Sequence, residues 1–182
     1  MKTIFHHAAA LIGMFIALTC EAEDKLYTAH NIWVEQPARM YVINYKVGTL
    51  IPAGTEVTDV AIVPNRRRTS ITFRLADSTV QHIIFIQKKF HPGLTPDAIK
   101  DRIFTTQDLK ALTAGMSKAE KECVRTGEIV AGISKDAVLV AYGYPPTHQT
   151  PTLKGPTWMY WRNRFGRRAI SFDAKDKVSG IR

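Results

Sequence analysis

The residues best suited to chemistry in this sequence are basic and aromatic, and they crowd one short stretch near its carboxyl end. Arginine guanidinium groups bind carboxylate and phosphate through paired hydrogen bonds, and tryptophan and tyrosine rings favour protein hot spots and the lipid headgroup layer. Rings on a core-facing side serve packing, whereas several arginines together cannot form a core. The sequence therefore predicts a partner- or anion-binding site formed by Trp161, Arg162, Arg164, Arg167 and Arg168.

A second basic cluster, Arg66-Arg67-Arg68, follows the turn residues Pro64-Asn65. A charge run in a turn is most often a solvated loop. We therefore do not include it in the predicted site.

Residues for catalysis or metal binding do not form a recognisable motif. The histidines considered, His30, His82, His91 and His148, are widely spaced and no cysteine pair accompanies them, so we expect no metal and no cofactor. The sequence contains neither a Gly-x-Ser-x-Gly elbow nor a glycine-rich phosphate loop. We expect a protein that is not an enzyme. The alternative is a hydrolase with a histidine-containing cleft, which would bring two or more of these histidines into one pocket.

Cys123 lies within a predicted helix. A lone cysteine in that setting is usually a small buried hydrophobic residue rather than a nucleophile.

The amino terminus predicts export. Lys2 precedes an apolar stretch from Ala8 to Leu18, and an acidic exit follows, which is typical of a signal peptide over residues 1–22. The apolar stretch is shorter than the roughly 20 residues needed to cross a bilayer, and no other stretch approaches that length. We expect a periplasmic or secreted protein with no transmembrane segment after processing.

Cys20 leaves two forms of the exported protein open. Cleavage after Ala22 would release a free chain beginning at Glu23. Acylation of Cys20 would instead anchor an outer-membrane lipoprotein, although Ala17-Leu18-Thr19 is a poor match to the usual lipobox.

The formal net charge is +9, and cleavage after Ala22 leaves it unchanged because Lys2 and Glu21 are lost together. An exported basic protein does not meet nucleic acid as its ordinary partner. The expected partners are an envelope protein with an acidic surface, anionic lipid or peptidoglycan, attracted by a field that salt weakens. The alternative is that the charge only keeps the protein soluble.

Residues 24–92 predict a small antiparallel β domain. Short runs rich in β-branched and aromatic residues alternate with turns, of which Val47 to Thr55 holds two glycines and Pro52. The segment from Tyr41 to Val57 resembles the SH3-like barrels that bacteria append to envelope proteins. This resemblance implies a small barrel that could attach to the cell wall.

A change to helical signals at His91-Pro92-Gly93 predicts a domain boundary, followed by a helical connector over residues 93–112. Thr95 is a good N-cap, with Pro96 in the first turn, for a helix that runs to about Ile103. Thr105 or Thr106 is expected to begin a second helix, which runs through Leu112.

Residues 113–182 predict an α-α-β-β-β unit. Ser117 and Glu120 form a capping-box pattern for a helix that ends at Gly127. Ser134 begins another helix, which stops at Gly143 before Pro145-Pro146. Three strands follow, and alternation places Trp158 and Tyr160 on one face of the first and Met159 and Trp161 on the other.

This carboxyl-terminal unit resembles the SmpA/OmlA, or BamE-like, domain family. The resemblance rests on Gly132 to Val138 at the helix start, Gly143-Tyr144-Pro145-Pro146 at its end, Trp158 to Trp161, Arg168 to Phe172, and Lys177-Val178. It implies a two-layer α/β module that contacts partner proteins and anionic lipid in outer-membrane assembly. Proteinaceous β-lactamase inhibitors share the architecture, so inhibition of a periplasmic enzyme is the alternative role.

Two features depart from the family's assembly factor: the poor lipobox and the additional β domain. We therefore carry over the fold and the binding character, but not membership of the assembly complex. The overall prediction is an α+β protein that serves as a non-enzymatic binding or assembly module of the cell envelope.

Overall fold

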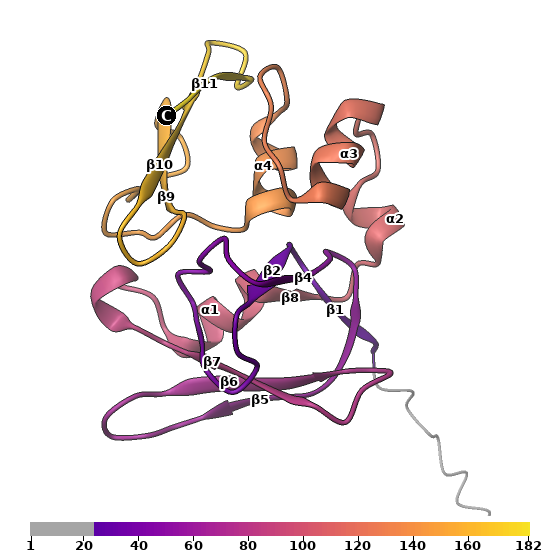
Figure 1. Cartoon of the computed structure of the whole chain (residues 1–182), viewed down its shortest axis with the longest axis vertical. Helices are drawn as coiled ribbons and strands as arrows, with labels where there is room; N and C mark the ends of the chain where they lie inside the picture. Colours follow the sequence, from indigo (N-terminus) through magenta and orange to yellow (C-terminus); the bar gives the residue numbers. More distant parts are fainter. Residues whose placement is uncertain (1–23) are drawn as a thin grey trace, which may run out of the picture.

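The computed structural model describes residues 24–182. The predicted signal peptide and Cys20 lie outside the described residues. The chain is α+β, with a curled sheet in its first part and helices packed beside a small sheet in its second part (Figure 1). The described helices include none that is both long and apolar enough to span a bilayer.

The first part is built on a six-stranded sheet in the order β3-β7-β6-β5-β1-β8, with a separate β2-β4 pair. A register shift between Thr58 and Ala61 marks a bulge in β5, and bulges increase the bend and twist of a strand. The strands are β1 (Leu26–Thr28), β2 (Ile32–Val34), β3 (Met40–Tyr41), β4 (Thr49–Ile51), β5 (Glu56–Val63), β6 (Ser70–Leu75), β7 (Gln81–Phe85) and β8 (Phe104–Thr105).

The prediction of a purely antiparallel domain needs one correction. β3 pairs in parallel with β7, with Met40 opposite Ile84 and Tyr41 opposite Phe85. A parallel pair needs a long crossover, which β4, β5 and β6 supply here. The pairing brings Tyr41 beside Phe85, at the edge of the sheet.

The predicted connector is largely part of the first core. A 3-10 turn, η1 (Lys88–Phe90), precedes α1 (Pro96–Ile103), and the Thr95 hydroxyl accepts from Ala98 N as expected of an N-cap. Ile99 and Ile103 are buried with the sheet residues, and β8 pairs with β1. The second helix, α2 (Leu109–Leu112), begins at an Asp108 cap rather than at Thr105 or Thr106.

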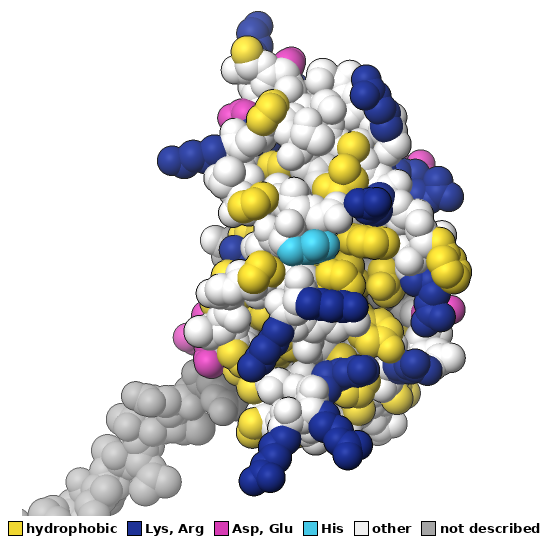
Figure 2. Space-filling model, turned by 90° about the vertical axis from the view of Figure 1, so that its left-hand side faces the viewer, with side chains coloured by type: hydrophobic (Ala, Val, Ile, Leu, Met, Phe, Trp, Pro, Cys, Tyr) yellow, Lys and Arg dark blue, Asp and Glu magenta, His cyan; other side chains and the backbone are white. Residues whose placement is uncertain are grey.

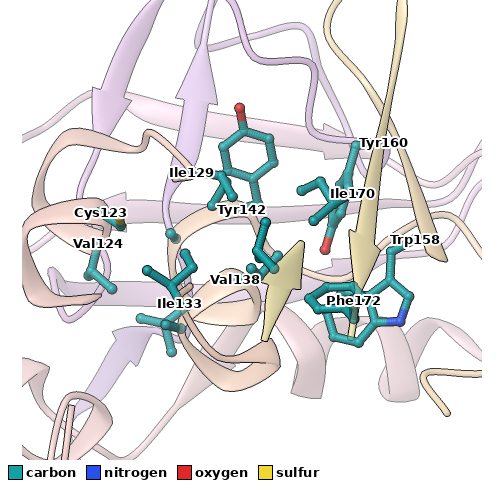
Figure 3. Close-up of a cluster of buried hydrophobic side chains, with 14 of the residues drawn as sticks. Cys123, Val124, Ile129, Ile133, Val138, Tyr142, Trp158, Tyr160, Ile170 and Phe172 are labelled. Carbon is teal, nitrogen blue, oxygen red and sulfur yellow. The ribbon is translucent and has the colours of Figure 1, made fainter. Parts of the chain in front are cut away.

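The second part has the predicted α-α-β-β-β order. α3 (Lys118–Thr126) has the predicted capping box, and Ser134 caps α4 (Lys135–Tyr142). The strands β9 (Thr157–Trp161), β10 (Arg167–Phe172) and β11 (Val178–Ile181) form an antiparallel sheet in the order β11-β10-β9. Trp158 and Tyr160 are buried with α4 and the other strands, as alternation predicts (Figure 3).

Two glycines allow the helices of the second part to approach the first part closely. Gly127 and Gly143 end α3 and α4 with φ values of 69° and 80°. A Cβ at Gly127 would lie 2.7 Å from the Trp33 ring, and one at Gly143 would lie 2.8 Å from the His30 ring. Both positions therefore require glycine for space as well as for backbone conformation.

Asn31 joins the two parts through hydrogen bonds at a fully buried position. Its Nδ2 donates to Val124 O on α3 (2.6 Å), its Oδ1 accepts from Ala53 N (2.7 Å), and its backbone N donates to Val140 O on α4 (3.0 Å). Asn31 therefore fixes how α3 and α4 sit on the first part.

Candidate anion-binding face

The β9–β10 hairpin separates the predicted site residues instead of gathering them. Trp161 lies opposite Arg167, and Arg168 lies opposite Tyr160. Successive strand residues point to opposite faces, so Trp161 and Arg167 share one face whereas Arg162 and Arg168 share the other. Arg164 lies in the turn between the strands. The prediction of a single cluster is therefore corrected to three separate positions.

Trp161 mainly packs against neighbouring rings. Its ring centroid is 6.2 Å from that of Phe90, and Phe90 in turn lies 5.1 Å from the His148 ring. The Arg167 guanidinium lies over Trp161 at 5.4 Å, and its Nη1 donates to Gln149 Oε1 (3.4 Å). This face of the hairpin covers the junction with η1.

The hairpin turn presents its residues outward. Asn163 Oδ1 accepts from Phe165 N (2.9 Å) and Gly166 N (2.7 Å), which holds the turn in one conformation. Phe165 is 88% exposed, and the Arg164 side chain is also exposed. A fixed turn with an exposed ring beside an arginine is suited to contact with a partner.

Arg164 belongs to a larger group that we call the basic–aromatic strip, defined as Arg39, Tyr41, Tyr45, Arg68, Phe85 and Arg164. The Arg68 guanidinium lies 5.3 Å from the Phe85 centroid, and the Tyr41 ring lies 6.2 Å from both the Phe85 and Tyr45 rings. Arg39 Nε donates to the Tyr41 hydroxyl (3.0 Å). The strip thus runs from the β5–β6 turn to the β9–β10 turn.

A groove of about 440 Å³ lies at one end of the strip. Arg39, Tyr41 and Tyr45 line it from the first part of the chain, and Asn163, Arg164 and Phe165 line it from the hairpin. Glu35 is its one acidic lining residue. The two parts of the chain therefore build this groove together.

Arg68 enters the strip because its turn is ordered. Asn65 Oδ1 accepts from Arg67 N (2.8 Å) and Arg68 N (3.3 Å), while Arg66 and Arg67 are exposed. The prediction of a solvated loop agrees with the exposure of all three arginines, and Arg68 in addition lies over the Phe85 ring. The parallel β3–β7 pairing, which local sequence does not reveal, is what places Tyr41 next to this ring.

The cations of the strip form no salt bridge within the described part of the chain, although Glu35 lies near Arg39. Arg39, Arg68 and Arg164 form no ion pair there, although Lys25, Arg74 and Arg125 do. Figure 2 shows Lys and Arg side chains spread along this side of the molecule, with hydrophobic side chains between them and few acidic ones. This face is therefore a strongly positive surface with uncompensated charge.

The two tyrosines of the groove have shifted pKa values. The hydrogen bond from Arg39 is the largest influence on Tyr41 and lowers its pKa. Burial raises the pKa of Tyr45, and the nearby charge of Arg164 opposes that rise. A tyrosine hydroxyl can donate a hydrogen bond to a carboxylate.

Two histidines converge, as the hydrolase alternative requires. His30 and His91 both line a cavity of about 20 Å³ together with Arg102 and Tyr144. Burial lowers the pKa of each to about 4, so both rings are neutral at pH 7. A space of that size holds about one water molecule, and no serine, cysteine or carboxylate lines it.

The remaining candidates for chemistry are packed side chains. His82 is buried and stacks on Phe73 with ring centroids 4.9 Å apart. Cys123 is buried, and burial raises the pKa of its thiol, which makes it less reactive. Across residues 24–182, no cluster of three or more His, Cys, Asp or Glu side chains is placed to hold a metal ion.

No protein-family model, curated protein or solved structure matches this chain.

Proposed function

We propose that this protein is an exported, non-enzymatic binding module that holds an acidic segment of an envelope partner protein in the groove of the basic–aromatic strip. The observation that carries the proposal is the uncompensated charge of Arg39, Arg68 and Arg164 beside aromatic rings. Arginine and tyrosine are enriched at protein hot spots. A carboxylate seated here can accept from guanidinium groups and from a tyrosine hydroxyl.

The shape of the site favours a protein segment over a membrane. The groove is concave, and the Tyr41 and Tyr45 rings that line it are only partly exposed. A flat headgroup layer would reach the protruding Phe165 and the exposed Arg66 and Arg67 but not the floor of the groove. A protruding acidic segment can reach all of these positions.

The amino-terminal sequence supports an envelope location for this activity. The predicted signal peptide would place the protein in the periplasm or outside the cell, and acylation of Cys20 would hold it at the outer membrane. The resemblance of residues 113–182 to BamE-like domains points to a binding or assembly role in the same compartment. An inhibitor role differs only in that the partner is an enzyme.

Fluorescence anisotropy with a labelled glutamate-rich peptide tests the proposal on the chain that begins at Glu23. The strip variant Arg39→Gln/Arg68→Gln/Arg164→Gln is expected to bind at least about tenfold more weakly than the wild type, because each lost charge removes a charge-assisted hydrogen bond. Raising salt from about 0.01 to 0.15 M is expected to weaken wild-type binding.

The matched control removes three exposed charges from α2 and α3, on the opposite side of Figure 1, with Lys110→Gln, Lys118→Gln and Lys121→Gln. It should bind the peptide as the wild type does. Equal losses in both triple variants would show that only net charge matters, and the proposal would fail. Binding to phosphatidylglycerol-containing vesicles or purified peptidoglycan without binding to the peptide would replace the protein partner with a lipid or cell-wall surface.

A further inference from the structure

A second cavity lies beside the β9–β10 hairpin, where Arg162 and Arg168 line it instead of the turn residues that line the groove of the strip. Its volume is about 430 Å³, and it lies between β2, α4 and the ends of β9 and β10. Lys46 N donates to Arg162 O (2.9 Å), and this bond joins the hairpin to the segment after β3. Tyr45 and Arg164 line the groove of the strip, whereas Lys46, Arg162 and Arg168 line the second cavity.

Two arginines and Lys46 line this space, and only Glu128 among its lining residues is acidic. None of these cations forms an ion pair with any carboxylate of residues 24–182. The positive charge of the two arginines is therefore not neutralised by an ion pair within these residues.

Lys46 has a structural role as well. Its Nζ donates to Tyr142 O (2.6 Å), the carbonyl of the last residue of α4, where the helix dipole favours a cation. The ammonium also lies 4.2 Å from the Trp33 ring centroid and 4.8 Å from that of Tyr142. Desolvation lowers the pKa of Lys46 well below its ordinary value. These contacts give Lys46 a role in the fold. They do not account for the presence of Arg162 and Arg168 at the same cavity.

Arg168 and Tyr142 provide donors at the cavity. Arg168 Nη1 donates to the Tyr142 hydroxyl (2.6 Å), which leaves the other guanidinium N–H groups and the hydroxyl proton free of described protein acceptors. Figure 3 shows that the Tyr142 hydroxyl points away from the buried cluster, whereas the Tyr160 hydroxyl points the other way and donates to Gly143 O (2.9 Å). Arg162 is exposed and adds a second guanidinium to the lining of the cavity.

The other walls are apolar and aromatic. Trp33 packs edge-on against Tyr142 with centroids 5.6 Å apart, and Ile129 and Ile181 also line the cavity, beside Thr126, Gly127 and Glu128. An anion that carries a flat or apolar group can therefore place its charge at the arginines and its body against these side chains.

We propose that this cavity is a second ligand site, which takes a carboxylate or phosphate attached to an aromatic or apolar group, with Arg162, Arg168 and the Tyr142 hydroxyl as its donors. The site is separate from the groove of the strip, because the two cavities share no lining residue. It can therefore succeed or fail separately from the proposed partner groove.

Calorimetric titration of the processed chain with benzoate, phenyl phosphate and benzamide tests the site. The two anions share the proposed chemistry, and benzamide has the same ring without charge. Benzoate or phenyl phosphate is expected to bind, whereas benzamide binds at least about tenfold more weakly. The anion that binds more tightly shows whether the site prefers a carboxylate or a phosphate as the anionic group of its ligand.

Arg162→Gln is the principal variant, because Arg162 is exposed and makes no side-chain hydrogen bond in the described structure, so its removal should not disturb folding. It should weaken anion binding about tenfold, and Arg168→Gln should do the same or more. Arg164→Gln, on the strip, is the control and should leave binding unchanged. Equal binding of benzamide, an equal loss in Arg164→Gln, or no binding of either anion would overturn the inference.

Discussion

Asn31 shows how one side chain decides the relation between the two parts of this molecule. It uses both side-chain groups and its backbone N–H to bind segments that are far apart in the sequence. Nothing in the local sequence around Asn31 indicates this, since asparagine is most often a turn or surface residue. Its role follows only from the distant partners Ala53 and Val124.

Asn31→Ala is expected to lower the free energy of unfolding by about 2–4 kcal/mol, because Ala53 N and Val124 O would be left buried without partners. Urea denaturation followed by fluorescence measures this change. Asn65→Ala, in the exposed β5–β6 turn, also removes a side-chain oxygen that accepts backbone hydrogen bonds. It should lower the free energy of unfolding by less than about 1 kcal/mol, because water can replace this acceptor. Similar losses for the two variants would show that Asn31 does not hold the parts together.

His30 and His91 predict a pH-dependent stability. Burial lowers both pKa values to about 4 from the ordinary 6.5, and Arg102 and His148 add positive charge near His91. Below pH 6.5 these histidines become protonated in the unfolded chain but stay neutral in the folded protein. Their contribution to the free energy of unfolding is therefore fully present above pH 6.5. It should fall as the pH drops towards 4, by up to about 3 kcal/mol per histidine.

Urea denaturation between pH 7 and pH 4 tests this dependence. Both ring nitrogens of His91 are buried without a hydrogen-bond partner, so His91→Phe should be neutral or stabilising at pH 7. It should also flatten the loss of stability below pH 6.5. An unchanged pH profile in this variant would show that His91 is not responsible.

At the scale of elements, the sequence predicts best what is decided locally. The caps at Thr95, Ser117 and Ser134 are all present, because a side chain caps a backbone N–H only a few residues away. The order of helices and strands in residues 113–182 is likewise confirmed. The parallel β3–β7 pair and the inclusion of α1 in the first core depend on distant residues, and for that reason local patterns did not predict them.

Glu120 links three elements. It completes the capping box of α3 through Ser117 N (2.9 Å), accepts from Ser134 N at the start of α4 (2.9 Å), and pairs with Lys177 before β11 (3.2 Å). Hydrogen bonds from Ser134, Ser117 and Lys177 hold the pKa of this carboxyl far below its ordinary value. Its contribution to stability is therefore present above the ordinary pKa and lost on strong acidification.

Glu120→Ala is expected to lower the free energy of unfolding by about 1–3 kcal/mol, because Ser117 N, Ser134 N and Lys177 lose the buried acceptor that they share. Thermal unfolding at pH 7 provides the measurement. Glu122→Ala, on the same helix but exposed and paired only with Arg125, should change stability little. Equal effects of the two variants would contradict a special role of Glu120 in joining α3, α4 and β11.

At the scale of the whole molecule, the basic–aromatic strip combines segments around residues 39–45, 68, 85 and 164. The sequence predicted that arginines of the hairpin bind anions, but it could not show that the hairpin divides them. Alternation along β9 and β10 separates Arg162 and Arg168 from Trp161 and Arg167, and the turn directs Arg164 to the groove. The strip's remaining residues come from the first part of the chain.

Mapping of amide chemical shifts with the glutamate-rich peptide tests the central claim most directly. Binding in the groove predicts that shifts concentrate at residues 35–47, around Arg68, and at Asn163 to Gly166, and that they fade with added salt. The amide chemical shifts of α2 and α3 should stay unchanged. Shifts spread evenly over the basic residues, or centred on α2 and α3, would contradict a specific acidic-segment site on the strip.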